Sequence, residues 1–132
     1  MKRFAPALLA VSLALLGGGC AASRSQVARD FTVMNETDVF ELHYGTLENF
    51  SNRQTFSWTN TGSRARVRQA SSVQSGVALV EIRDPSGLVV HSKNLREQGS
   101  FVSFEGKPGV WKITVILDRA AGSLTFEVRK NP

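Results

Sequence analysis

The chain has 132 residues, of which 42% are hydrophobic, and this length and composition fit one globular domain of modest size. Sixteen cations exceed eleven acids, which gives a formal net charge of +5. One cysteine and two histidines exclude an internal disulfide and leave no set of Cys and His residues with the spacing of a metal site.

The first twenty residues have the pattern of an export leader. Lys2 and Arg3 precede an apolar run from Ala7 to Leu16, and glycines then lead to Cys20. The run is about ten residues long, well below the roughly twenty that a membrane-spanning helix requires. We therefore predict that residues 1–19 are a signal peptide.

The segment from Gly17 to Cys20 resembles the lipobox of bacterial lipoproteins, with Gly17 where that family usually has leucine. In the family the cysteine thiol is lipidated and becomes the new N-terminus, so the resemblance implies lipidation of Cys20. Ala21 is compatible, in the family, with sorting to the outer membrane. The alternative is cleavage before Ser23 by an ordinary signal peptidase, which would give a soluble periplasmic or secreted protein without cysteine.

Removal of the leader also changes the charge balance. Lys2 and Arg3 are lost, so 14 cations remain against 11 acids, a net charge of +3. A small positive excess is ordinary for a protein surface, and we expect no nucleic-acid partner. Residues 20–30 are small and polar. We interpret them as the anchor cysteine and a tether, with the folded domain over residues 31–132.

Residues 31–53 give a mixed pattern, in which Val39 to Tyr44 fits a strand and a short helix near Leu47 is an alternative. From Gln54 onward, apolar residues recur with a period of two, which indicates strands. Phe56 and Trp58 alternate with polar residues in the first of these. The predicted strands that follow centre on residues 64–68, 77–82, 88–91, 101–104, 111–117 and 124–128.

Glycine and proline turns separate these strands. Asp84 to Gly87 fits a type I turn and Lys107 to Gly109 fits a type II turn. Six or seven short strands, each with one apolar face, predict an all-β fold, an antiparallel two-sheet sandwich of the jelly-roll kind. A small up-and-down or Greek-key β-barrel is the alternative architecture.

The second half of the chain carries a further resemblance. A strand over residues 75–83 leads into the turn from Asp84 to Gly87, followed by Pro108-Gly-Val-Trp111 and a last strand that begins at Gly122. This order is similar to that of pre-peptidase C-terminal domains and of the GOLD/CUB-like group of jelly-roll sandwiches. The resemblance implies an accessory role in binding, targeting or assembly, without chemistry of its own.

The sequence offers no recognisable catalytic constellation. It has no Gly-x-Ser-x-Gly elbow, no His-Glu-x-x-His pair and no glycine-rich phosphate loop. His43 and His91 stand in no motif, and we interpret His91 as a residue at the rim of a strand. Asp84 and Asp118 are weak calcium candidates, because a turn also prefers aspartate before proline. We therefore expect no enzymatic activity, no metal and no cofactor.

Arg64, Arg66 and Arg68 form the sharpest surface feature. On a strand these side chains share one face at intervals of about 7 Å. Guanidinium groups suit phosphates and carboxylates, so the row predicts binding of anionic glycan, lipopolysaccharide or lipid headgroups. The alternative is a solvated face paired with Glu81 or another acid. Trp58 is a further ligand-binding candidate, as a stacking surface for sugars, or else a core residue.

The sequence thus favours a non-enzymatic bacterial cell-envelope protein, lipid-anchored through Cys20, whose sandwich binds another envelope protein. The rival hypothesis is a binding module for anionic glycan or lipid that uses Arg64, Arg66, Arg68 and Trp58. Both place the protein in the cell envelope, with the outer membrane as the expected site.

Overall fold

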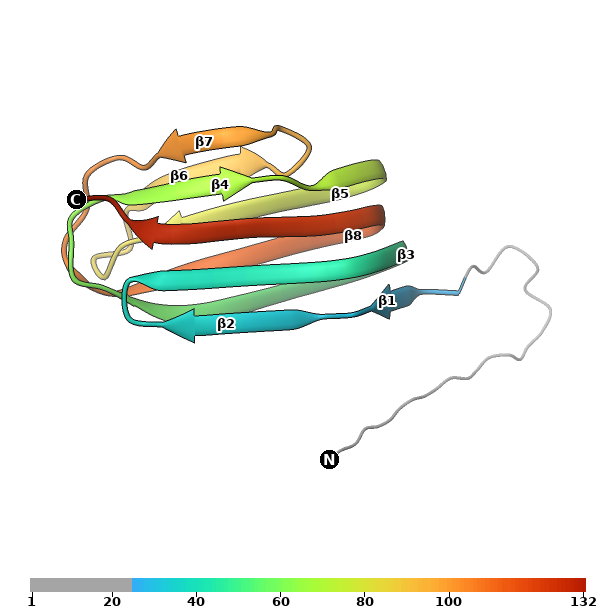
Figure 1. Cartoon of the computed structure of the whole chain (residues 1–132), viewed down its shortest axis with the longest axis horizontal. Coiled ribbons are helices and arrows are strands. Elements are labelled where there is room, and N and C mark those ends of the chain that lie inside the picture. The colour runs from blue at the N-terminus through green and yellow to red at the C-terminus, as the bar shows by residue number, and fades with distance from the viewer. Residues whose placement is uncertain (1–24) are drawn as a thin grey trace, which may run out of the picture.

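The computed structural model describes residues 25–132, which form eight strands and no helix (Figure 1). Every strand pair is antiparallel. The described residues include no helix that could span a membrane. The predicted leader, Cys20 and the first part of the predicted tether lie outside the described residues. The strands are β1 (Val27–Arg29), β2 (Thr32–Glu36), β3 (Val39–Asn60), β4 (Ala65–Gln69), β5 (Ser72–Arg83), β6 (Val89–Asn94), β7 (Gly99–Val102) and β8 (Gly109–Lys130).

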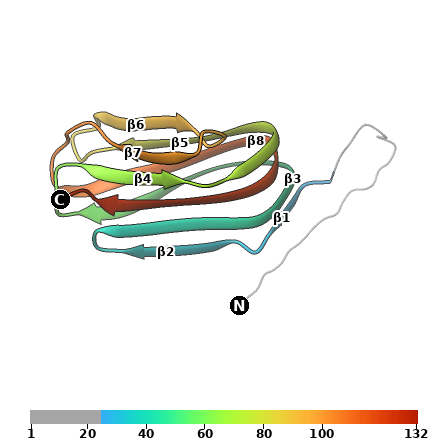
Figure 2. The ribbon, with the colours of Figure 1, turned by 45° about the horizontal axis from the view of Figure 1, so that its top comes forward.

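Two strands of 22 residues, β3 and β8, run through both layers of the fold. The first half of β3 pairs with the second half of β8, and the second half of β3 pairs with the first half of β8. Both strands turn back between their halves, at the end of the molecule that carries β1 (Figures 1 and 2). Two sheets therefore share their central strands.

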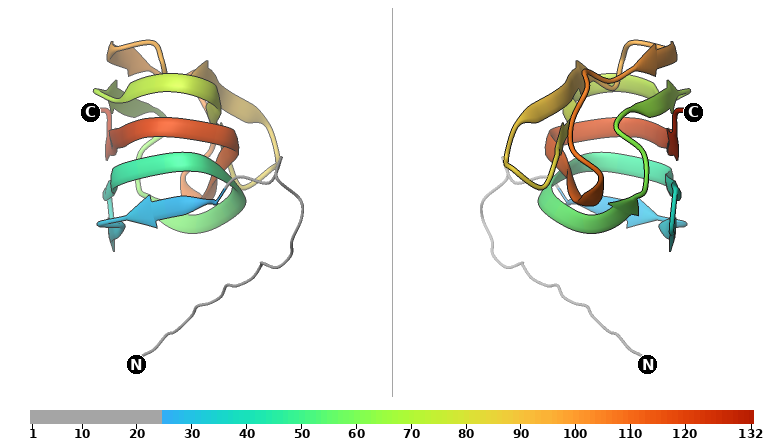
Figure 3. Two further views of the ribbon diagram at one scale, coloured as in Figure 1. Left: turned by 90° about the vertical axis from the view of Figure 1, so that its right-hand side faces the viewer. Right: turned by 90° about the vertical axis from the view of Figure 1, so that its left-hand side faces the viewer.

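The first sheet adds β1 and β2 on one side of this shared pair and β4 and β7 on the other. The second sheet adds β5 and β6. β4 and β5 pair with successive parts of β8. The segment that contains β4 and β5 therefore also runs from the first sheet to the second, as the end-on views in Figure 3 show. Within residues 25–132 the order of paired strands ends at edge strands and does not close. The fold is the predicted antiparallel sandwich, not the barrel.

The core lies between the two sheets and follows the period-two pattern of the sequence. Trp58 and Trp111 are paired in register, and their rings meet edge to face with centroids 6.0 Å apart. Each indole N–H donates to a backbone oxygen, that of Trp58 to Glu36 at 3.0 Å and that of Trp111 to Lys107 at 2.7 Å. The other large, fully buried side chains include Phe40, Leu42, Leu47, Ile82, Ile113, Leu124 and Phe126.

Two glycines make the bend compact. Gly122 has a φ of 126° and Gly76 a φ of 80°, conformations that residues with side chains rarely adopt. A Cβ atom on Gly122 would overlap the carbonyl oxygen of Ser72, and one on Gly76 would overlap that of Arg119. The backbones of β5 and β8 therefore approach each other at the bend more closely than a side chain would allow.

The structure corrects the prediction for the N-terminal part. β1 lies inside the predicted tether and pairs with β3, so the folded domain begins before residue 31. The helix alternative near Leu47 is wrong, because β3 continues through this residue with shifts of register between Tyr44 and Asn52. Leu47 is buried and Asn49 takes a positive φ of 48°, so a bent strand produces the mixed pattern.

A second correction concerns the predicted strand over residues 101–104. β7 ends at Val102, and the side chain of Phe104 is 74% exposed. The backbone N–H of Phe104 donates to the oxygen of Val90 in β6 at 2.8 Å. The chain thus leaves the first sheet here and crosses towards the second.

We expect Gly122→Ala to lower the free energy of unfolding by at least about 2 kcal/mol, because the new methyl group meets backbone in a conformation that already disfavours a side chain. Gly87→Ala is the matched control. Gly87 has a φ of 92°, but a Cβ there would meet nothing within 4 Å, so we expect a loss of about 1 kcal/mol. Denaturant titration measures both losses, and equal values would contradict the importance of the close approach.

Candidate functional site

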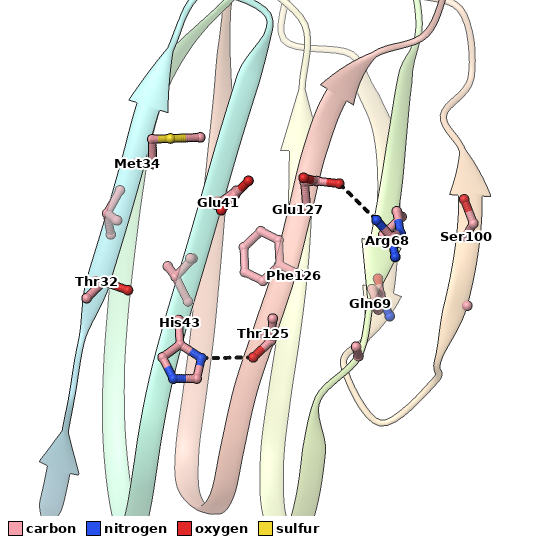
Figure 4. Close-up of a pocket in the computed structure, with 14 residues that line it drawn as sticks. Thr32, Met34, Glu41, His43, Arg68, Gln69, Ser100, Thr125, Phe126 and Glu127 are labelled. Carbon is pink, nitrogen blue, oxygen red and sulfur yellow. Dashed lines mark hydrogen bonds and ion pairs between the residues drawn. The ribbon is translucent and has the colours of Figure 1, made fainter.

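An open groove of about 540 Å³ crosses the outer face of the first sheet (Figure 4). Five strands contribute to it, in the spatial order β2, β3, β8, β4 and β7. Because side chains alternate between the two faces of a sheet, every second residue of each strand can reach this surface. The polar side chains that line the groove are those of Thr32, Glu41, His43, Arg68, Ser100, Thr125 and Glu127, together with Gln69.

The register of the strands sets these side chains in two rows. One row runs across the sheet through Met34, Glu41, Glu127, Arg68 and Ser100. The other row contains Thr32, His43 and Thr125. In the second row, Nδ1 of His43 lies 2.9 Å from the hydroxyl oxygen of Thr125. The groove therefore offers hydroxyl, imidazole, carboxylate and guanidinium groups side by side.

The charged groups of the groove compensate one another. Glu41 and Glu127 are direct cross-strand neighbours, an arrangement that is unfavourable for like charges. A guanidinium nitrogen of Arg129 lies 2.9 Å from Glu127 and 3.7 Å from Glu41, and Arg68 lies 3.5 Å from Glu127. Partial burial opposes ionisation of Glu127, but hydrogen bonds with Arg129 and Glu41 and the charges of Arg129 and Arg68 lower its pKa. The two acids and two arginines thus form one ionic network.

The predicted arginine row runs along β4, with Arg64 directly before the first residue of the strand. Arg64, Arg66 and Arg68 are exposed and alternate with buried residues, so all three lie on the outer face of the first sheet. Of the three, Arg68 lines the groove. Arg64 lies 3.6 Å from Glu105, whereas Arg66 donates to the neutral side chains of Ser100 and Asn131. The row is therefore partly neutralised by neighbouring acids.

Of the two options predicted for this row, pairing with Glu81 or with another acid, the structure excludes Glu81. Glu81 belongs to β5 in the second sheet, and its carboxylate lies 3.1 Å from Arg83. The acids that face the arginines are Glu105 and Glu127, the first in the crossing segment and the second on β8. The expectation of a solvated face paired with acids thus holds for Arg64 and Arg68, with other partners.

Trp58 is not available to a ligand. Its side chain is 1% exposed, packs against Trp111 and donates its N–H to the backbone of Glu36. The hypothesis of a stacking surface at Trp58 is therefore wrong, and the alternative of a core residue is confirmed. The cause is the phase of β3, whose even-numbered residues face the core after the bend.

His91 is buried, not at the rim of a strand as predicted. Its side chain is 5% exposed, Nε2 lies 3.3 Å from Oε1 of Gln69, and its ring centroid lies 6.2 Å from that of Phe101. Burial, with a contribution from the charge of Lys93, lowers the pKa of His91 to about 4. The imidazole is therefore neutral at physiological pH and belongs to the packing between the sheets.

Asp84 anchors a turn, which is one of the two roles that the sequence predicted for this residue. Its carboxylate accepts hydrogen bonds from the backbone N–H groups of Ser86, Leu88 and Lys107 at 2.9 to 3.0 Å. The bond from the Ser86 hydroxyl, at 2.6 Å, is the main reason why the pKa of Asp84 falls to about 2. These donors already use both oxygens of the carboxylate.

The calcium hypothesis gains no support from the geometry. Asp84 lies beyond the end of β5 that is opposite the bend, whereas Asp118 pairs with Val77 at the bend and lies 3.4 Å from Arg119. Residues 25–132 contain no group of three or more His, Cys, Asp or Glu side chains placed to hold a metal ion. The two aspartates thus do not meet in one site.

No protein family matches the sequence, and no similar sequence is found among characterised proteins. Among solved structures, the fold is similar to a chain in the crystal structure of accessory secretory proteins 1, 2 and 3 of Streptococcus pneumoniae. The match has a TM-score of 0.37 and 13% sequence identity, and it covers 79% of this chain and 87% of that chain. A likeness this distant identifies neither a family nor a function.

The buried imidazole makes stability sensitive to pH. The pKa of His91 is about 4 in the folded protein against 6.5 for an unperturbed histidine, so acid favours the unfolded chain. We expect the free energy of unfolding to fall by roughly 1–2 kcal/mol between pH 7 and pH 5. His91→Gln should remove most of this loss, whereas His43→Gln, at an exposed position, should retain it. Denaturant titration at both pH values measures the difference, and an unchanged pH dependence in His91→Gln would contradict the assignment.

Proposed function

We propose that the protein is a non-enzymatic, lipid-anchored cell-envelope protein that uses the outer face of its first sheet to bind another envelope protein. The open groove on that face is the observation that carries the binding part of this proposal. The anchoring part rests on the sequence, in which a cationic start and a short apolar run lead to Cys20. The expected membrane is the outer membrane.

The chemistry of the groove favours a protein partner. Glu41, Glu127, Arg68 and Arg129 compensate one another, so the surface does not demand a ligand of strong net charge. Met34 stands at one end of the same row and is 37% exposed. Arginine and methionine are enriched at protein interfaces. A partner with a mixed surface can exchange hydrogen bonds with the polar members of the row and pack an apolar group against Met34.

A second candidate function is binding of anionic glycan, lipopolysaccharide or lipid headgroups. The observation in its favour is the neighbourhood of Arg66, which pairs in register with Arg129 and makes side-chain hydrogen bonds with neutral partners. Two adjacent guanidinium groups suit a phosphate or carboxylate. The ion pairs of Arg64, Arg68 and Arg129 with acids weaken this candidate relative to the first.

We expect Cys20→Ala to abolish incorporation of labelled fatty acid and to move the protein from the membrane fraction to the soluble fraction. Cys20 is the only thiol in the sequence, and each buried methylene of an acyl chain contributes about 0.8 kcal/mol to membrane binding. Mass spectrometry of the mature N-terminus provides the direct measurement. A wild-type protein that begins at an unmodified Ser23 would contradict the anchoring proposal.

A photo-crosslinking residue in place of Ser100 tests the groove as the binding site. We expect it to give adducts with one protein in intact cells, at several times the yield obtained from Lys112. Lys112 is the matched control, because it is exposed on the outer face of the second sheet. Adducts that carry glycan or lipid instead of protein would favour the second candidate. Equal yields at the two positions would contradict a binding role for the groove.

A further inference from the structure

The N-terminal chain enters the domain at one defined end. We call this the bend end, where residues 45–52, 72–77 and 118–122 turn from one sheet to the other, and the opposite end the open end. At the bend end, Val27 pairs with Glu48, and the side-chain oxygen of Gln26 accepts the backbone N–H of Ser51 at 2.9 Å. β1 and the C-terminus lie at opposite ends of the molecule (Figures 1 and 2).

The maximum span of the tether is shorter than the first sheet measured along its strands. Cys20 and Val27 are seven residues apart in the sequence, so a fully extended chain spans at most about 25 Å between them. Along β3, the distance from Glu48 at the bend end to Val39 at the open end amounts to about 30 Å at the rise of an antiparallel strand. An upright domain with its open end on the bilayer would therefore pull Cys20 away from the lipid surface.

The side chains at the bend end suit contact with a lipid surface. Arg29 and Arg53 are exposed, Arg119 is 75% exposed, and Val77 is an apolar residue that is 40% exposed. Arginine side chains can bind anionic headgroups while their aliphatic stems contact the interface. Acids also belong to this end of the molecule, at Asp30, Glu48 and Asp118. The contact is therefore expected to be weak by itself and to depend on the anchor.

We propose that the bend end faces the lipid bilayer that holds the acylated Cys20, and that the open end points away from it. This inference rests on the proposed lipid anchoring. Two observations carry it: the attachment of β1 at the bend end and the short distance that seven residues can span. In this orientation the strands of the first sheet point away from the membrane surface. The groove on the outer face of this sheet therefore remains open to a partner.

Fluorescence quenching of the lipidated protein in vesicles tests the orientation. The vesicles consist of phosphatidylethanolamine and phosphatidylglycerol with a quencher on some headgroups. Acylation blocks Cys20, so Val77→Cys at the bend end or Thr37→Cys at the open end supplies one free thiol for a fluorophore. Arg53→Cys provides a second position near the bend if Val77→Cys does not fold. We expect several-fold stronger quenching at position 77 or 53 than at position 37.

The outcomes separate the orientation from the anchoring. Protein that floats with the vesicles and is quenched equally, or more strongly, at position 37 overturns the orientation and leaves the lipid anchor intact. Protein that carries no acyl group by mass spectrometry and does not float overturns the anchor and the orientation together. Strong quenching at the bend end with weak quenching at position 37 supports both.

Discussion

The fold depends on the close approach of two backbones where the long strands turn back. Gly122 and Gly76 bring β8 and β5 together in conformations that exclude side chains, and this contact lets the strands leave one sheet and enter the other. The two layers are therefore joined by continuous strands as well as by loops. Because β3 and β8 belong to both sheets, packing lost in one layer weakens the other.

The proposed binding surface is rigid because its central strands are those that the two sheets share. Its two rows of side chains stand on strands whose opposite faces contribute Phe40, Leu42, Leu124 and Phe126 to the core. The groove is thus held by the same packing that joins the sheets. Its ionic network lies on the solvent side, where Arg129 links two acids from adjacent strands. A surface on strands, with its charges already paired, presents a fixed pattern to a partner.

The sequence predicted the regular parts of this structure well and the bend poorly. The period-two alternation of apolar and polar residues correctly predicted that the arginines of β4 share one face and that the apolar residues of β8 lie in the core. The aspartate and glycine of residues 84–87 correctly identified a turn. Periodicity failed around residues 45–52, where shifts of register interrupt it. It also could not place Trp58 or His91, because the burial of a residue depends on which strands later cover it. The groove was missed because β2 contributes Thr32 and Met34 from a strand with almost no buried face.

We expect the shared strands to make the two sheets one cooperative unit. Native-state hydrogen exchange tests it on backbone amides of β3 on either side of the bend, over residues 40–44 and 55–59. The slowest amides of both segments should exchange with the same free energy, equal to that of global unfolding. Exchange of one segment at a clearly lower free energy, while the other stays protected, would contradict it.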